Sequence, residues 1–145
     1  MASDKKLFKL IDKIAEVYDD PALKPKDGVT YCNIAVQHIL NAFNYQKLNG
    51  LMANMMIERM RQYAEFVKIG MEKAQGYANM GYVVIAGKEG QPHGHVCIVR
   101  PGLEATSGKW KKNVPKCMNI GKDVSIGKGV NYAFQEIPEF WVLSV

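Results

Sequence analysis

The sequence contains no long apolar run, although 48% of its 145 residues are hydrophobic. No stretch approaches the roughly 20 consecutive apolar residues of a membrane-spanning helix, so we expect a soluble chain with no membrane span. The first 20 residues also lack the apolar region and the small-residue cleavage site of a secretory signal. Three locations stay open: the cytoplasm, a place reached without a standard signal peptide, or export by a signal outside this sequence.

Cysteine is scarce, with Cys32, Cys97 and Cys117 at a spacing that matches no metal-binding pattern. Because their number is odd, at least one thiol should be free. Cys97 and Cys117 lie in apolar, strand-like runs and fit small core residues, although a disulfide between them stays open. His93 and His95 could form a metal pair, but no third and fourth ligands occur at zinc spacing. We expect neither a metal nor another cofactor.

Acidic residues are in modest deficit, since 19 Lys and Arg outnumber 14 Asp and Glu for a net charge of +5. This surplus suits an anionic partner, such as nucleic acid, lipid or a cell-wall polymer, without choosing among them. The basic residues are spread along the chain, and the densest run, Lys109, Lys111 and Lys112, has no aromatic interleaving of the kind that binds single strands. We expect a solvated basic surface and no nucleic-acid site.

The length of the chain fits one domain over residues 1–145. Apolar residues at helical spacing predict a helix over residues 4–18, with Asp4 as its cap. We expect this helix, within residues 1–20, to be a peripheral addition to the domain.

Two more helical patterns follow in the first half of the chain. One starts at Cys32 and extends to Phe43, with Thr30 as the predicted N-cap. The other is the Met-rich stretch 51–80, broken near Gly70, which fits core packing better than a binding groove.

The second half of the chain is rich in strand-like runs. A helical half followed by an antiparallel-looking strand half predicts an α+β fold, with the N-terminal helices packed on one face of a small antiparallel sheet. The predicted strands cover residues 82–86, 95–100, 114–120, 132–137 and 139–145.

Cys32 has a setting that favours reactivity, because it begins a helix in the segment TYCNIAVQHIL. A thiol at a helix N-terminus feels the positive end of the helix dipole, which favours the thiolate. Most helix cysteines are nevertheless inert small hydrophobic residues, so the position alone does not decide the matter.

His95 begins a predicted strand in the segment GHVCIVRPG. If residues 114–120 form its antiparallel neighbour and the loop is symmetric about residue 107, Arg100 lies opposite Val114 and His95 lies opposite Asn119. An amide oxygen at that place accepts the imidazole N–H and fixes the tautomer of the ring. The order helix cysteine, strand histidine and strand asparagine favours a nucleophile, a base and an orienting residue over three separate structural roles.

Four other residues compete for or complement these roles. Glu104 is the rival orienting residue, although its loop position favours solvation. We place His93 in the loop before the strand, as a substrate-binding residue. His38 lies about 240° around the helix from Cys32, by the 3.6-residue period, and should face elsewhere. Tyr31 is a candidate neighbour of an oxyanion and fits core packing equally well.

The chain resembles the papain-like cell-wall hydrolases of the NlpC and CHAP groups in four segments: TYCNIAVQHIL, EKAQGYANMGYVVIAG, GHVCIVRPG and VPKCMNIG. The resemblance covers most of residues 28–145, which would be the hydrolase core. It implies a papain-like α+β fold and an amidase or endopeptidase that cuts peptidoglycan stem peptides through a thioester. Cys32 would be the nucleophile, His95 the base and Asn119 the orienting residue. Such an enzyme would reach the cell wall through a phage or a non-classical secretion route.

Two alternatives stay open beside this interpretation. The same cysteine and histidine could serve a protease, deamidase or transferase that acts on a protein. In a different class, the chain could be a binding or adaptor module whose Met-rich helices dock a partner and whose Cys32 is inert. We expect a monomer, and an inhibitor protein stays open as a partner.

Overall fold

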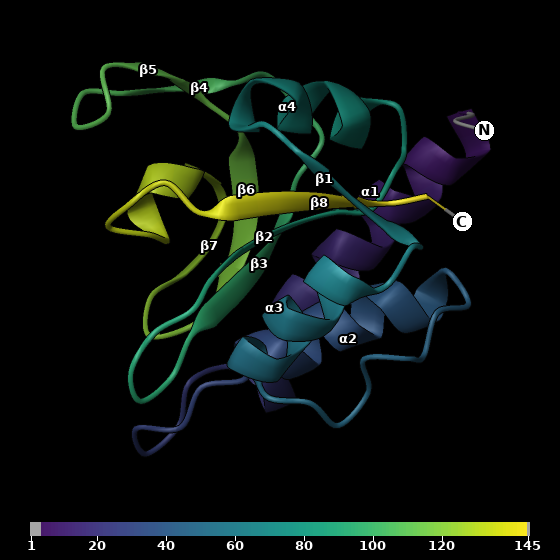
Figure 1. Cartoon of the computed structure of the whole chain (residues 1–145), viewed down its shortest axis with the longest axis vertical. Helices are drawn as coiled ribbons and strands as arrows, with labels where there is room; N and C mark the ends of the chain where they lie inside the picture. The colour runs from purple at the N-terminus through teal and green to yellow at the C-terminus, as the bar shows by residue number, and fades with distance from the viewer. Residues whose placement is uncertain (1–3, 145) are drawn as a thin grey trace.

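A computed structural model of the chain describes residues 4–144, in which a six-stranded sheet has helices on both faces (Figure 1). The strands lie in the order β1-β8-β2-β3-β6-β7, and the five pairings between them within this part of the chain are antiparallel. A separate ribbon consists of β4 (Ala105–Ser107) and β5 (Lys112–Val114). The sheet strands are β1 (Phe66–Ile69), β2 (Val84–Lys88), β3 (His95–Val99), β6 (Lys116–Ile120), β7 (Val124–Gly129) and β8 (Glu139–Leu143). The α+β class is confirmed.

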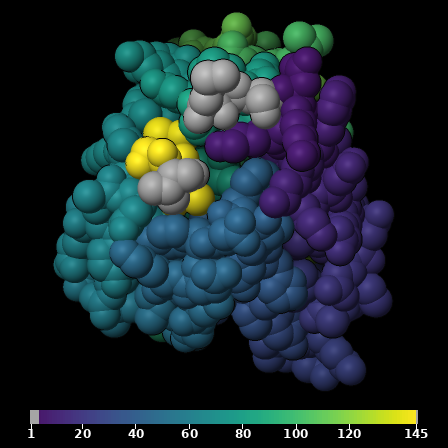
Figure 2. Space-filling model, turned by 90° about the vertical axis from the view of Figure 1, so that its right-hand side faces the viewer, coloured from purple at the N-terminus to yellow at the C-terminus, as the bar shows by residue number. Residues whose placement is uncertain are grey.

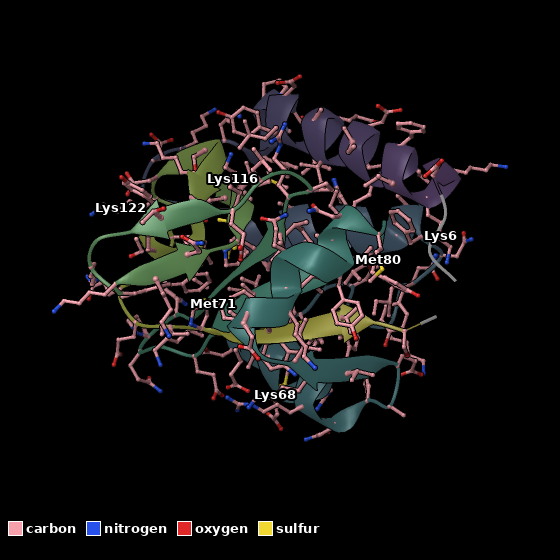
Figure 3. The ribbon with its side chains drawn as sticks, turned by 90° about the horizontal axis from the view of Figure 1, so that it is seen from above. Lys6, Lys68, Met71, Met80, Lys116 and Lys122 are labelled. Carbon is pink, nitrogen blue, oxygen red and sulfur yellow. The ribbon has the colours of Figure 1, made fainter. Side chains whose placement is uncertain are left out.

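The helices divide between the two faces of this sheet. Of those described, α1 (Asp4–Asp19), α2 (Cys32–Ala42) and α3 (Ala53–Gln62) pack on one face, and α4 (Met71–Asn79) packs on the other. Figure 3 views the second face, with α4 lying across it between Met71 and Met80. The expectation that the helices share one face is therefore wrong for α4, because the edge strand β1 carries the chain from one side of the sheet to the other.

The alternation of side chains along β3 produces two buried clusters. Val96 and Ile98 join the cluster beneath α1, α2 and α3, whereas Cys97 and Val99 join the cluster beneath α4. Successive residues of a strand point to opposite faces, so a strand buried on both sides reads as a continuous apolar run. This explains why the segment VCIV has no polar face.

The first helix is an integral part of the core. Leu10, Ile14 and Val17 are buried in the same cluster as α2, in place of the peripheral packing that its sequence suggested. Figure 2 shows α1 (purple) lying along the blue chain of α2 and the residues after it. Asp4 is the first residue of the helix, and the position of its cap lies outside the described residues.

Several predicted boundaries differ from the structure in the second half of the chain. The stretch 51–80 contains the strand β1 between its two helices, and the strand expected at 82–86 begins two residues later. The run 114–120 is divided at Pro115, because proline has no N–H for the ladder and occupies the junction of β5 and β6. The run 132–137 forms turns after the 3-10 helix η2 (Val130–Tyr132).

The strand β7 was not predicted, since its sequence VSIGKG has glycine and lysine where a strand pattern has apolar residues. The short 3-10 helix η1 (Pro21–Leu23) lies in the loop between α1 and α2. Within residues 4–144, no helix combines the length and the apolar character that crossing a membrane requires.

Candidate active site

Cys32 lines a surface cleft of about 400 Å³ although only 7% of the residue is exposed. Four segments form the cleft: the turn before α2, the start of α2, the start of α3, and the loop between β2 and β3. Its lining residues are Gly28, Val29, Thr30, Cys32, Asn33, Met52, Ala53, Asn54, Pro92, His93 and Gly94. The volume lies within the range of small-molecule sites, about 300–1,000 Å³.

The helix that carries Cys32 begins without a side-chain cap. Tyr31 occupies the N-cap position and makes no capping hydrogen bond, so the prediction of Thr30 as the cap is wrong by one residue. The first helical bond from the turn runs from the amide of Ala35 to the carbonyl of Tyr31, at 2.9 Å. The backbone N–H groups of Cys32 and Asn33 interact with the Cys32 thiol instead. A missing cap thus leaves donors at the place where the sulfur lies.

The backbone N–H of Val96, near the start of β3, also lowers the pKa of the Cys32 thiol. Val96 faces the side of the sheet that α2 covers, whereas His95 alternates with it and faces the side of Cys97 and Phe134. The thiol and the imidazole therefore lie on opposite sides of β3. Within residues 4–144, no hydrogen bond joins the sulfur to a histidine ring. Burial raises the pKa of the thiol, and the three backbone hydrogen bonds oppose this effect by a smaller amount. The resting thiol is therefore protonated, in contrast to the thiolate that the helix dipole alone would favour.

His95 and Asn119 form a hydrogen-bonded pair, with Nε2 of the ring 2.5 Å from Oδ1 of the amide. The other end of the amide, Nδ2, donates to the carbonyl of Asp123 at 2.9 Å. This second bond fixes which end of the amide faces the ring. Because Oδ1 can only accept, Nε2 carries the proton and Nδ1 keeps its lone pair. The ring is thus held in the tautomer that can accept a proton at Nδ1.

The predicted strand register is wrong by two residues, yet the predicted contact forms. Ile98 pairs with Met118, and continuing this ladder places Gly121 opposite His95. A Cβ added to Gly121 would lie only 2.8 Å from Cε1 of His95, so the ring packs directly over this glycine. A shift of two residues keeps every side chain on its face of the sheet, so Asn119 becomes a diagonal neighbour of His95 on the same side.

The surroundings of the His95 ring favour its neutral form. Burial lowers the pKa of His95, and the hydrogen bond with Asn119 opposes this effect by a smaller amount. Phe134 packs near the ring, with 5.2 Å between the two ring centres. A neutral imidazole with a free Nδ1 can act as a general base. The structure does not bring it to the thiol, because the ring packs on the side of β3 that faces away from Cys32.

The other candidate residues have different surroundings. His93 lines the cleft together with Cys32, so this surface holds a second imidazole. Tyr31 packs against the core cluster and is absent from the cleft lining. Glu104 is exposed in the loop before β4, while Asn119 occupies Nε2 of His95.

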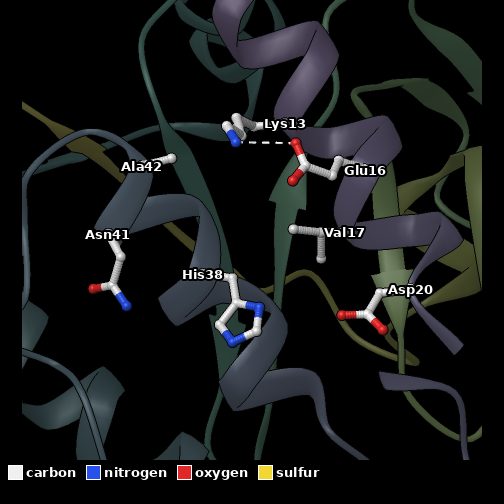
Figure 4. A pocket seen from close by; sticks show the side chains of 7 residues that line it. All are labelled: Lys13, Glu16, Val17, Asp20, His38, Asn41 and Ala42. Atoms are coloured by element: carbon white, nitrogen blue, oxygen red, sulfur yellow. Dashed lines mark hydrogen bonds and ion pairs between the residues drawn. The ribbon is translucent and has the colours of Figure 1, made fainter. Parts of the chain in front are cut away.

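His38 lies in a separate hollow of about 350 Å³ between α1 and α2 (Figure 4). Lys13 and Glu16 form an ion pair at 3.0 Å on its α1 side. The two lining sets share no residue, so His38 faces away from Cys32.

Three side-chain amides that the sequence analysis missed hold the walls of the cleft. Asn33 and Gln37 of α2 both donate to the carbonyl of Leu51, at 3.0 and 2.8 Å. Asn54 of α3 donates to the carbonyl of Gly90 at 2.8 Å and accepts from its amide at 3.1 Å. No local pattern reveals these contacts, because the partners lie between 14 and 36 residues apart.

The loop between β2 and β3 requires glycine at two positions. A Cβ on Gly94 would lie 2.1 Å from Oδ1 of Asn54, and one on Gly90 would lie 2.6 Å from the carbonyl oxygen of His93. The loop that places His93 in the cleft is therefore closed tightly against Asn54.

The three cysteines are all free thiols, so the disulfide left open for Cys97 and Cys117 is absent. These two thiols are buried, and burial, followed by the neighbouring Cys117 thiol, raises the pKa of Cys97. Among residues 4–144, no group of three or more His, Cys, Asp or Glu side chains is arranged to hold a metal ion. Cys32 is the one cysteine that lines the cleft.

In comparisons with known proteins, no family model matches the chain, and no curated sequence matches it significantly. The sequence motifs and the geometry of the cleft are therefore the indications of function.

Proposed function

We propose that this protein is a papain-like cysteine amidase or endopeptidase that cleaves the stem peptides of peptidoglycan. The observation that carries the proposal is the position of Cys32, which lines the cleft at the start of α2, the helix that packs on β3, the strand that begins with His95. Asn119 holds the ring of that histidine in the tautomer that a base requires. The substrate follows from the resemblance of the motifs, and the net charge of +5 suits an anionic wall polymer.

The reaction begins with transfer of the thiol proton from Cys32 to Nδ1 of His95 as the sulfur attacks the amide carbonyl. The tetrahedral intermediate then collapses, and His95 gives the proton to the leaving amine, which leaves a thioester on Cys32. Water attacks the thioester while His95 takes a proton from it, and release of the acid restores the thiol. Because the ring of His95 and the sulfur of Cys32 lie on opposite sides of β3, this transfer requires the ring to turn toward Cys32 when substrate binds.

The start of α2 supplies the groups that stabilise the intermediate. Cys32 and Asn33 are the first two residues of α2, where backbone N–H groups have no acceptor within the helix, and the N–H groups of both lower the pKa of the thiol. Such backbone donors stabilise the oxyanion, and loss of one typically costs about a hundredfold or more in turnover. His93 lines the same cleft and would contact the bound substrate there. To meet its substrate, the protein would reach the wall by a phage or non-classical route.

Digestion of purified peptidoglycan with mass-spectrometric detection of the products tests this proposal. We expect cleaved muropeptides with the wild type, none with Cys32→Ala, and cleavage with Cys97→Ala, which removes a free thiol outside the cleft. Equal cleavage by the wild type and Cys32→Ala contradicts the nucleophile. Cleavage of a protein panel in place of peptidoglycan would assign a protease, deamidase or transferase.

One observation favours a second function, since burial raises the pKa of Cys32 and a binding module with an inert thiol has the same feature. Alkylation of the folded protein with iodoacetamide separates the two functions. For the hydrolase we expect modification of Cys32 that depends on His95, measured as a slower rate in His95→Ala. A thiol that reacts only after unfolding supports the binding module.

A further inference from the structure

Two large apolar side chains remain exposed beside the candidate nucleophile. Val29 is 50% exposed and Met52 is 60% exposed, and both line the cleft that contains Cys32. A single exposed apolar residue is ordinary on a protein surface. Two that share a cavity with a thiol form an apolar wall that a ligand can cover.

The backbone at both positions is held by hydrogen bonds. Val29 closes a tight turn with Lys26, with backbone hydrogen bonds of 3.0 and 2.9 Å in the two directions. Asp27 and Gly28, the central residues of this turn, have φ of 53° and 79°, the left-handed values of a two-residue hairpin turn. Met52 precedes α3, and its carbonyl accepts the amide of Met56 at 2.9 Å. The apolar wall is thus preorganised rather than formed by mobile chain.

The remaining lining side chains carry no fixed charge. Thr30, Asn33 and Asn54 are neutral, and His93 is the other titratable residue beside Cys32 in this lining. A charged substrate side chain would lose its hydration in the cleft without gaining an ion pair. An apolar side chain would gain contact with Val29 and Met52.

We propose that the cleft selects substrates with uncharged, apolar side chains on the acyl side of the scissile amide, and that Val29 and Met52 determine this specificity. The inference rests on the proposed function, because the occupant must present its carbonyl to Cys32. The occupant is the substrate rather than a partner protein, since the apolar wall and the nucleophile line one cavity.

Peptidyl chloromethyl ketones test the specificity without knowledge of the natural bond. We would compare Ac-Ala-Ala, Ac-Glu-Glu and Ac-Lys-Lys chloromethyl ketones, in which both acyl-side residues change together. The rate of Cys32 modification is followed by intact mass, with iodoacetamide as a reagent that has no side chain. We expect the alanyl reagent to react at least about tenfold faster than either charged reagent, relative to iodoacetamide.

Two lysine substitutions on the same segment provide the matched comparison. Met52→Lys adds a positive charge to the cleft, so we expect the ratio of glutamyl to alanyl rates to rise about tenfold. Met55→Lys adds the same charge at a side chain that is 39% exposed and outside the cleft lining, so the ratio should stay unchanged. Because both methionines are exposed, neither variant should unfold, which thermal melting checks.

The outcomes distinguish a failure of the proposed specificity from a failure of the proposed hydrolase function. Equal rates for the three reagents in the wild type, or equal ratio changes in Met52→Lys and Met55→Lys, overturn the specificity while leaving a reactive Cys32. Failure of every reagent, iodoacetamide included, to modify Cys32 in the folded protein overturns both.

Discussion

The ring of His95 and the amide of Asn119 form a 2.5 Å hydrogen bond although the two residues are diagonal rather than opposite across β3 and β6. The residue opposite His95 is Gly121, which has no side chain to occupy the place of the ring. A larger residue there would push the imidazole away from Asn119. Gly121 is thus as much a part of the site geometry as the residue that holds the ring.

We predict that Gly121→Ala lowers activity about tenfold, the effect of losing roughly 1.4 kcal/mol of transition-state stabilisation. The new Cβ would lie 2.8 Å from Cε1 of His95, so the ring must move and its bond to Asn119 weakens. Gly127→Ala is the matched control, because a Cβ at that β-strand glycine has no neighbour within 4 Å. The readout is muropeptide release with thermal melting in parallel. Unchanged activity in Gly121→Ala, or an equal loss in both variants, contradicts the role of the ring position.

The lowered pKa of His95 predicts that the protein loses stability in mild acid. A histidine in the unfolded chain has a pKa of about 6.5. As the pH falls through this value, the unfolded chain takes up a proton before the folded protein does. The contribution of His95 to the free energy of unfolding is therefore fully present above pH 6.5. It is lost progressively as the pH falls toward the lower pKa of His95 in the folded protein. Denaturant unfolding between pH 7 and 5 measures this slope.

His95→Gln should flatten this slope, because glutamine does not titrate. The window lies above the range in which the lowered pKa values of Glu65 and Glu139 contribute. A slope of equal size in the wild type and His95→Gln would show that another group is responsible.

The elements that the sequence predicted best are those whose pattern has a single physical meaning. The apolar stripe of α2 has the helical period, the run VCIV of β3 is a continuous apolar segment between turn residues, and both elements are present. The strand β7 was missed because its stability comes from pairing with β6 rather than from its own composition. The strand β1 was missed because a four-residue strand between two helices resembles a continued helix.

The candidate site shows the same division between local and long-range information. The contact of His95 with Asn119 was predictable because strand pairing keeps faces together even when the register is shifted by two residues. The burial that raises the pKa of Cys32, and the effect of the Val96 N–H on that pKa, depend on how α2 packs on the sheet. Neither follows from the sequence near Cys32.

The core position of α1 is tested by Leu10, which is fully buried although its helix was expected to be peripheral. We predict that Leu10→Ala lowers the free energy of unfolding by about 2–5 kcal/mol, the cost of a cavity in a packed core. Phe8→Ala on the same helix removes a larger side chain that is 61% exposed and should cost far less. Denaturant unfolding measures both. Similar small losses in the two variants would show that α1 adds little to the core.

The amide of Asn54 offers the sharpest test of how the loop between β2 and β3 is positioned. It forms two hydrogen bonds with the backbone of Gly90 and lies against Gly94, one residue before His95. Asn54→Ala releases this loop, so we predict at least about a tenfold fall in kcat/KM for muropeptide cleavage. The alkylation rate of Cys32 should change as well, because the start of β3 provides the backbone N–H of Val96 that lowers the pKa of the thiol.

Asn79→Ala is the matched control, because Asn79 makes the same pair of bonds to Gly102, donating to its carbonyl at 3.0 Å and accepting from its amide at 2.8 Å. The two substitutions remove equal hydrogen bonding from loops on different parts of the sheet. If Asn54 is merely structural, the melting temperature falls in both variants and the rate of Cys32 alkylation is the same in both. If Asn54 positions the loop between β2 and β3, activity and the rate of Cys32 alkylation change in Asn54→Ala alone, because this loop leads directly to His95 and Val96. Equal activity loss in the two variants would assign Asn54 to stability and leave the placement of the base to Asn119 and Gly121.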